Sequence, residues 1–167
     1  YKTYCYNKKL EGSNTTLLDT RKTLPGLRYE QKYSVVIGGG QNHRMGLYDA
    51  ALVKENHIAS SGSIKKAVET LRNNEVKIIE VEVENLDELR EAIDSGADIA
   101  MLDNFKQRDI VAAVEIAANK IKLEVSGNID VYTLSAIKEL DIDYISSGDL
   151  TKNISATDYS LKFKSID

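Results

Sequence analysis

The chain has 167 residues, a formal net charge of -4 at pH 7 and 42% hydrophobic residues. A chain of this length is expected to form one domain around its own hydrophobic core. The composition fits poorly with disordered, collagen-like or disulfide-rich proteins, and no run of about eighteen uncharged apolar residues is present to span a membrane. An acidic chain is also a poor general nucleic-acid binder, because affinity for phosphates comes from an excess of Lys and Arg.

The only cysteine, Cys5, has no partner for an internal disulfide and no spaced Cys or His ligands for a zinc site. This cysteine usage predicts a reducing, cytoplasmic location. The chain begins at Tyr1 without Met and without a signal pattern. We therefore expect it to be a piece of a longer protein.

Short apolar runs alternate with stretches of helical spacing along most of the chain, as in parallel sheets joined by crossover helices. The predicted strands are residues 16–18, 33–37, 51–53, 77–83, 98–102, 122–125 and 143–146. The predicted crossover helices are residues 64–72, 86–95, 108–119 and 131–140. Asn85 or Asp87 is expected to cap the start of the second helix, and Gly96 to follow its end.

Polar residues end or follow five of these strands, at positions 54, 82, 103, 126 and 146, with spacings of 28, 21, 23 and 20 residues. This near-regular period indicates strand-plus-helix units in an α/β fold. We predict a parallel α/β barrel with its site at the C-terminal ends of the strands. An open doubly wound sheet would bind ligands at the same ends, but Gly38-Gly39-Gly40 lacks the dinucleotide-binding spacing.

The N-terminal third contains five candidate donors for one anion: Arg21, Lys22, His43, Arg44 and Lys54. The planar fork of Arg pairs with both oxygens of a carboxylate, whereas Lys acts as a point charge, so a mixed set suits a small polyanion. The alternative is that these are scattered surface cations and that the histidine is structural.

Glu82 and Asp103 each close a predicted strand, one strand-helix unit apart, so a barrel would make them neighbours. Two close carboxylates suit Mg²⁺, which takes one or two carboxylates together with waters and substrate phosphates. The alternatives are an acid-base pair, or plain alternation of polar residues, since Glu80 and Glu84 flank Glu82.

Ser-Gly turns follow the last two strands, at residues 126–128 and 146–151. Glycine lets the backbone approach a phosphate closely, and many barrels bind phosphate at their last two strands. These turns are therefore candidate phosphate loops, although Ser and Gly also form ordinary turns.

Long motifs occur in a fixed order at residues 18–28 (LDTRKTLPGLR), 38–49 (GGGQNHRMGLYD), 54–57, 80–84, 101–105 and 126–127. With these motifs the chain resembles, over nearly its full length, the C-terminal domain of the quinolinate phosphoribosyltransferase family. The resemblance implies an incomplete α/β barrel. It also implies a pentosyltransferase of NAD biosynthesis that converts quinolinate and phosphoribosyl pyrophosphate to nicotinate mononucleotide, pyrophosphate and CO2.

The resemblance also implies roles for individual residues. Those implied to hold quinolinate are Arg21, Lys22, His43, Arg44 and Lys54. Those implied to face the ribose and Mg²⁺, directly or through water, are Glu82 and Asp103, which together with Lys54 are the predicted catalytic residues. Those implied to bind the phosphate are Ser126, Gly127 and Gly148, with Lys152 standing where family members often have a histidine.

In this family an N-terminal domain of a neighbouring subunit closes the site, and that domain is not recognisable in this chain. The resemblance therefore implies a homodimer or larger homo-oligomer, and we expect the chain to be inactive alone. Two other functions remain open. One is a related phosphoribosyltransferase-like protein with another substrate, such as the relative found with molybdenum-transport systems. The other is a non-catalytic binding module.

Overall fold

The computed structural model describes residues 1–164. The first half of that range contains, in order, α1 (Lys2–Lys9), β1 (Thr16–Leu18), α2 (Arg28–Ile37), β2 (Ala51–Val53), α3 (Glu55–Ser61), α4 (Ile64–Asn73) and β3 (Ile79–Val83). The second half contains α5 (Leu86–Asp94), β4 (Ile99–Asp103), α6 (Gln107–Ala117), β5 (Lys122–Ser126), α7 (Val131–Ile137), β6 (Tyr144–Ser146) and the 3-10 turn η1 (Gly148–Leu150).

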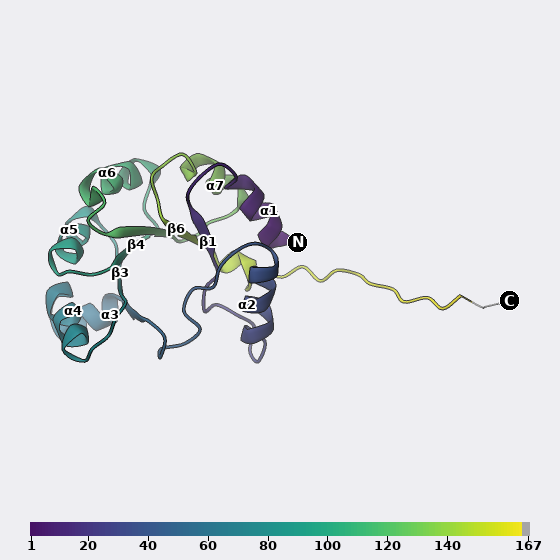
Figure 1. Cartoon of the computed structure of the whole chain (residues 1–167), viewed down its shortest axis with the longest axis horizontal. Coiled ribbons are helices and arrows are strands. Elements are labelled where there is room, and N and C mark those ends of the chain that lie inside the picture. Colours follow the sequence, from purple (N-terminus) through teal and green to yellow (C-terminus); the bar gives the residue numbers. More distant parts are fainter. Residues whose placement is uncertain (165–167) are drawn as a thin grey trace.

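The strands form a single parallel sheet in the order β1-β6-β5-β4-β3-β2. The sheet is curved, and the helices lie around its outer, convex face (Figure 1). Within residues 1–164, β1 and β2 are edge strands that do not pair with each other, so the ring of strands stays open. The predicted α/β fold and incomplete barrel are therefore confirmed.

The two faces of each strand carry different residues. In β3, Ile79, Val81 and Val83 belong to the buried apolar core beneath the helices. The residues between them, Glu80 and Glu82, belong to the opposite, concave face, where Glu82 lines a cavity. The same alternation runs through β4 and β5. The core thus lies between sheet and helices, and the concave face carries mainly polar groups, together with Met101 of β4.

The crossover helices begin and end close to the predicted residues. Asn85 is confirmed as the N-cap of α5, because its side chain accepts hydrogen bonds from the backbone N–H groups of Asp87 and Glu88. Gly96 follows the last turn of this helix with a φ of +76°, a conformation that glycine adopts at low cost. Ser63 caps α4 in the same way as Asn85 caps α5.

The prediction of a strand at residues 33–37 is wrong, because these residues form the second half of α2. The run Tyr33-Ser34-Val35-Val36-Ile37 is typical of a strand by composition, yet only Val35 among its apolar residues is buried. A single buried apolar residue in this run fits a helix on the surface of a domain, which turns only one face toward the core. Neither α1 nor α3 is predicted from the sequence.

A buried ion pair joins α2 to the end of β1. The ammonium of Lys32 and the carboxylate of Asp19 are both fully buried and in contact, and Lys32 also donates to the backbone oxygen of His43 at 2.8 Å. Asp19 accepts in addition from the His43 N–H at 2.9 Å and from the Asn42 side chain at 2.5 Å. This network fixes the segment that follows α2 and leads toward β2.

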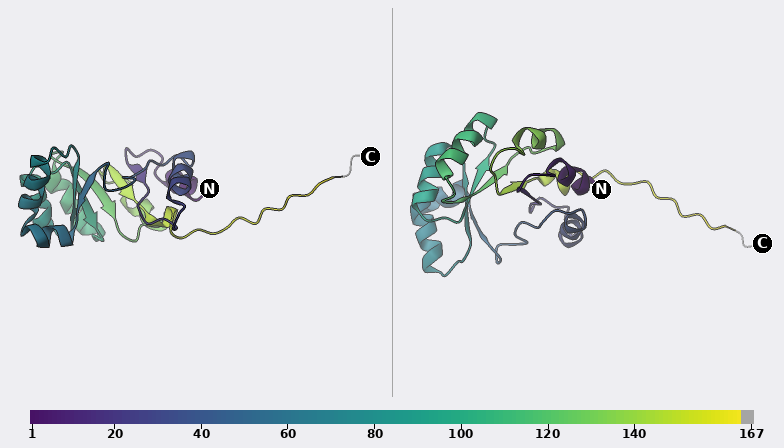
Figure 2. Two further views of the ribbon diagram at one scale, coloured as in Figure 1. Left: turned by 90° about the horizontal axis from the view of Figure 1, so that it is seen from below. Right: turned by 45° about the horizontal axis from the view of Figure 1, so that its top comes forward.

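The segment after η1 runs away from the domain (Figure 2). Residues 155–164 form no helix or strand, and their side chains are exposed. None of the helices in residues 1–164 has the length and apolar character needed to cross a bilayer.

The Lys32 to Asp19 pair gives a first test. Lys32→Met would leave the Asp19 carboxylate buried without its charge partner, so we expect the free energy of unfolding to fall by about 3 kcal/mol in urea denaturation. Lys65→Met is the control, because Lys65 and Glu69 form an exposed pair at 4.0 Å. That variant should change stability by less than about 0.5 kcal/mol. Equal losses in the two variants would contradict a structural role for the buried pair.

Candidate functional site

A cavity of about 620 Å³ opens at the C-terminal ends of the strands, on the concave side of the sheet. Its volume suits a small organic ligand. Every residue that the sequence singled out for a site contributes to its lining. These residues are Arg21, Lys22, His43, Arg44, Lys54, Glu82, Asp103, Ser126, Gly127, Gly148 and Lys152. The structure thus brings them together, and their individual roles stay predictions.

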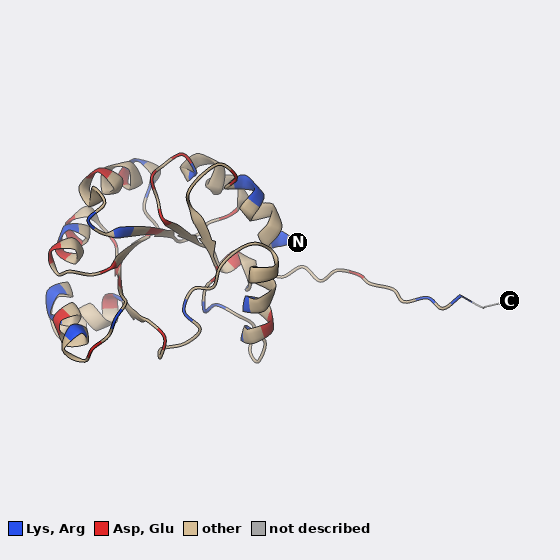
Figure 3. Ribbon diagram, viewed as in Figure 1, with Lys and Arg blue, Asp and Glu red and all other residues tan. Residues whose placement is uncertain are grey.

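The cationic residues reach the cavity from the open side of the ring. Arg21 and Lys22 follow β1, Arg44 follows the segment fixed by Asp19, and Lys54 follows β2. Charged residues of both signs also lie on the outer helices (Figure 3), so charge alone would not have located the site. Location at the strand ends distinguishes these cations from those on the surface.

Four of these cations have no acidic partner in the part of the chain that the structure describes. Among residues 1–164, no ion pair involves Arg21, Lys22, Arg44 or Lys152. The Nε atom of Arg21 is buried without a hydrogen-bond partner. Burial, together with the positive charge of Arg21, lowers the pKa of Arg44. Like charges have therefore been gathered in one cavity, an arrangement that an anionic ligand would stabilise.

The acidic residues lie on two neighbouring strands. Glu82 is in β3 and Asp103 ends β4, and the register pairs Glu82 with Met101, two residues before Asp103. The Glu82 carboxylate forms an ion pair with the ammonium of Lys54. Asp103 accepts a hydrogen bond from the Asn104 side chain at 2.8 Å. The cavity thus has an acidic wall beside its cationic wall.

The two Ser-Gly turns lie side by side at the ends of β5 and β6. The Ser146 hydroxyl donates to the Ser126 hydroxyl at 3.0 Å. The turn after β6 is joined to the cationic wall, because the Thr151 hydroxyl donates to the backbone oxygen of Lys22 at 2.7 Å. In the same turn, Gly148 lies close to the side chains of Lys22 and Lys152.

Sequence reasoning missed the residues that support this turn. Asp149 lines the cavity and accepts hydrogen bonds from the Tyr6 hydroxyl at 2.5 Å and from Lys2 at 3.1 Å. Burial favours a higher pKa for Asp149, but the hydrogen bonds from Tyr6, Asn153 and Lys2 outweigh it and lower the pKa. Tyr6 and Lys2 lie on α1, for which the sequence offered no apolar periodicity.

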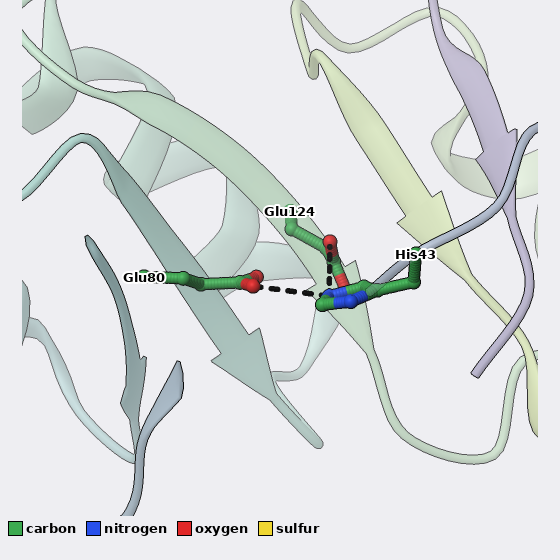
Figure 4. A group of neighbouring side chains, drawn as sticks. All are labelled: His43, Glu80 and Glu124. Atoms are coloured by element: carbon green, nitrogen blue, oxygen red, sulfur yellow. Dashed lines mark ion pairs between the residues drawn. The ribbon is translucent and has the colours of Figure 1, made fainter. Parts of the chain in front are cut away.

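Sequence reasoning also missed the residues that surround His43. Its Nε2 lies 3.0 Å from a carboxylate oxygen of Glu80 and 3.4 Å from one of Glu124, and both glutamates are buried (Figure 4). Glu124 lies in β5, at the residue that pairs with Met101, and Glu80 lies in β3. The sequence did contain a signal for these glutamates, since each lies between two apolar residues of a strand, as Glu82 does.

These three groups influence one another's protonation. Burial favours a lower pKa for His43, but hydrogen bonds to Glu124 and Glu80 outweigh it and raise the pKa to about 10. Burial raises the pKa of Glu80 to about 7, while the hydrogen bond from His43 acts in the opposite direction. The two carboxylates, taken without the other contacts of the ring, therefore favour a protonated imidazole with a hydrogen on Nε2.

Residues 2–162 match the family described as "Quinolinate phosphoribosyl transferase, C-terminal domain". The chain belongs to the quinolinate phosphoribosyltransferase family. This finding confirms the resemblance carried by the motifs in the sequence.

Relatives within the family are similar over most of this chain. A protein of Bacillus subtilis (strain 168) named "Probable nicotinate-nucleotide pyrophosphorylase (carboxylating)" is 43% identical over 154 residues, which cover 91% of this chain and 53% of that protein. A Methanocaldococcus jannaschii protein of the same name is 44% identical over 162 residues, covering 92% and 57%. This chain thus spans about half the length of the curated relatives it matches.

Solved structures of the family have the same fold. The structure of NadC from Streptococcus pyogenes superposes with a TM-score of 0.92 at 44% identity, covering 97% of this chain and 57% of that chain. The nicotinate-nucleotide pyrophosphorylase from Francisella tularensis superposes with a TM-score of 0.88 at 54% identity, covering 92% and 55%. In both, the similar part amounts to a little over half of the solved chain.

The turn after β5 gives a second test. Gly127 has a φ of +96°, and a Cβ at this residue would lie 2.3 Å from the Asn104 side-chain oxygen and 2.8 Å from the Asn104 backbone nitrogen. We expect Gly127→Ala to lower the free energy of unfolding by about 3 kcal/mol, because strain and overlap add.

Gly96→Ala is the matched control, because Gly96 also has a positive φ but has no atom within 4 Å of an added Cβ. This variant should lose only about 1 kcal/mol. Thermal or urea denaturation measures both variants. A loss at Gly127 no larger than that at Gly96 would show that close packing against Asn104 does not constrain the turn.

Proposed function

We propose that this chain is the barrel domain of an enzyme that transfers phosphoribose from phosphoribosyl pyrophosphate to the ring nitrogen of quinolinate. The products would be nicotinate mononucleotide, pyrophosphate and CO2, in NAD biosynthesis. One observation carries the proposal: cations that have no acidic partner among residues 1–164 gather in one cavity beside two carboxylates and two Ser-Gly turns. The names of the relatives point to the same reaction.

The cationic wall is suited to quinolinate, which carries two carboxylates on adjacent ring carbons. Arg21 and Arg44 can each pair with a carboxylate through two parallel hydrogen bonds, and Lys54 adds a point charge. Their mutual repulsion in the free site would be relieved when the dicarboxylate binds. His43 borders the same wall.

The acidic wall is suited to the ribose of the second substrate and to Mg²⁺. Glu82 and Asp103 provide carboxylate oxygens, the ligand type that Mg²⁺ prefers, and both line the cavity. They would hold the cation directly or through water. When bound there, Mg²⁺ would neutralise charge on the pyrophosphate.

The Ser-Gly turns are suited to the phosphate of phosphoribosyl pyrophosphate. Ser126 and Gly127 in one turn and Gly148 in the other border the cavity, with Lys152 beside Gly148. Backbone N–H groups in such turns and a nearby ammonium bind phosphate oxygens. Lys152 would supply the charge where related sequences often have a histidine.

In the transfer, the bond from the ribose carbon to pyrophosphate breaks and a bond from that carbon to the ring nitrogen forms. Positive charge develops on the ribose, where Glu82 and Asp103 would stabilise it. Loss of CO2 then leaves an electron pair on the ring carbon, and this pair forms a C–H bond with a proton from solvent. Arg21, Arg44 and Lys54 would stabilise the negative charge of that step, since fixed charges need no rearrangement during the reaction.

We also propose that a second subunit completes the site, in a homodimer or larger homo-oligomer. The exposed residues Tyr29, Tyr33, Val36 and Ile37 form an apolar stripe along α2, next to the open side of the ring. A helix with an apolar outer stripe is typical of a surface that another protein segment covers. Residues outside this chain would provide that segment.

The reaction itself is tested by release of pyrophosphate and CO2 from quinolinate and phosphoribosyl pyrophosphate with Mg²⁺. We expect no turnover with this chain alone, and turnover when it is extended at its N-terminus by the corresponding half of a full-length relative. Turnover by this chain alone, at the rate of the extended protein, would contradict the shared site. No turnover by the extended protein, together with no binding of quinolinate, would favour a relative with another substrate.

Quinolinate binding gives a further test. Arg44→Gln removes one bidentate partner, so we expect the dissociation constant of quinolinate in calorimetry to rise at least about tenfold. Arg108→Gln is the control, because Arg108 lies on α6 with its side chain exposed, and it should leave the constant unchanged. Equal affinities in both variants would mean that Arg44 does not hold the dicarboxylate.

Removal of the metal tests the acidic wall independently of the cationic wall. We expect a chelator to weaken the binding of phosphoribosyl pyrophosphate about tenfold or more, because its pyrophosphate loses the cation held near Glu82 and Asp103. Quinolinate binding, which depends on the cationic wall, should stay the same in the same titration. If the chelator has no effect on phosphoribosyl pyrophosphate, the magnesium site is wrong.

A further inference from the structure

Two buried glutamates on the concave face have no role in the reaction described above. Glu80 and Glu124 are 3% and 1% exposed, and their carboxylates converge on the imidazole of His43 (Figure 4). They come from β3 and β5, with β4 between them, so they approach the ring from two directions. The ring in turn borders the cavity beside Arg44.

The other ring nitrogen also has a hydrogen-bond partner. Nδ1 of His43 accepts a hydrogen bond from the backbone N–H of Arg44 at 2.8 Å. A backbone N–H is only a donor, so a hydrogen on Nδ1 would point at the Arg44 hydrogen. The contact therefore describes a ring whose single hydrogen is on Nε2, between the two carboxylates. It opposes the doubly protonated ring that the carboxylates alone would favour.

A metal ion is the main alternative use of this cluster. Nε2 of His43 and one oxygen each of Glu80 and Glu124 lie within 4.8 Å of one another, as metal ligands do. However, a histidine that binds a metal through Nε2 normally donates a hydrogen bond from Nδ1 to a carbonyl or carboxylate. Here Nδ1 faces a donor, so the surroundings of the ring select the tautomer that cannot ligate a metal through Nε2.

The cluster is costly for the fold. Oε1 of Glu80 and Oε1 of Glu124 are buried and have no hydrogen-bond partner among the described residues. Buried polar atoms without partners lower stability, and most sites in native proteins avoid them. Two such atoms around one ring point to a requirement other than stability.

We propose that Glu80 and Glu124 are positioning residues that hold the His43 ring in one orientation and one tautomer. The two carboxylates accept the hydrogen of Nε2. Nδ1 then carries no hydrogen, so it accepts from the Arg44 N–H and fixes the Arg44 backbone and the beginning of its side chain. The proposal rests on the proposed function in one respect: the fixed Arg44 guanidinium is the one that would bind quinolinate. His43 then contributes through its place in the wall, because both its nitrogens already have partners within the protein.

The first measurement is made on the wild-type chain and needs no ligand. Nitrogen-15 NMR of the histidine rings distinguishes a bare ring nitrogen from one that carries a hydrogen. We expect His43 to show a single form, with a bare Nδ1 and a hydrogen on Nε2. A doubly protonated ring, an Nδ1–H form or a mixture of forms would overturn the proposal, whatever the protein binds.

The second measurement uses variants. The pair Glu80→Leu and Glu124→Leu removes both acceptors, so we expect His43 to exchange between forms. His57 is the internal reference: its Nδ1 also accepts a backbone N–H, from Lys54 at 2.9 Å, but no carboxylate within residues 1–164 forms an ion pair with its ring. Its signal should not change. Glu80→Gln is the conservative control, because its amide oxygen still accepts from Nε2–H, and it should behave as wild type.

Quinolinate binding by the same variants separates positioning from simple electrostatics. Removing two negative charges beside an anion site would by itself tighten binding, whereas loss of positioning should weaken it about tenfold. Tighter or unchanged binding in the double variant would overturn the link from the glutamates to Arg44. If wild type fails to bind quinolinate, the proposed function fails, and the ring measurements still decide whether the glutamates position His43.

Discussion

Each strand of this sheet has to satisfy two different surroundings, and the rest of the structure depends on how it does so. Residues such as Ile79, Val81 and Val83 pack beneath the helices and supply the hydrophobic stabilisation. The residues between them, such as Glu80 and Glu82, lie on the concave face, where most of the residues that line the cavity are polar or charged. The core and the cavity are therefore encoded in the same short segments, in opposite phases of one alternation.

This arrangement explains why the strand ends could be predicted and one element could not. Buried parallel strands show as short apolar runs separated by helical periods, and the runs before positions 54, 82, 103 and 126 had both features. Residues 33–37 share the β-branched composition of a strand but lie in a helix, and α2 packs against the domain through Val35 together with the buried polar residues Gln31 and Lys32. Composition cannot separate these cases when a run is only five residues long.

The site shows a similar division. The site residues that end strands or lie in glycine turns could be predicted from their positions, and all of them line the cavity. The residues that hold them in place could not be predicted. Asp19 and Lys32 are 13 residues apart in the chain, and Lys2 and Asp149 are 147 apart. Their partners are set by tertiary packing, which has no local signature. Glu80 and Glu124 are an intermediate case. The alternation of their strands predicts which face they lie on, but it does not predict their shared contact with His43.

The pairing of β1 with β6 has a consequence for how the domain is made. These strands lie at opposite ends of the sequence, with Thr16 beside Tyr144, so their contact has one of the largest chain separations in the fold. Contacts of high sequence separation are slow to form and raise the contact order of a domain. Arg21 and Lys22 follow one of these strands and Gly148 and Lys152 follow the other. On the ribosome, the cationic residues after β1 and the turn after β6 can meet only after nearly the whole domain has emerged.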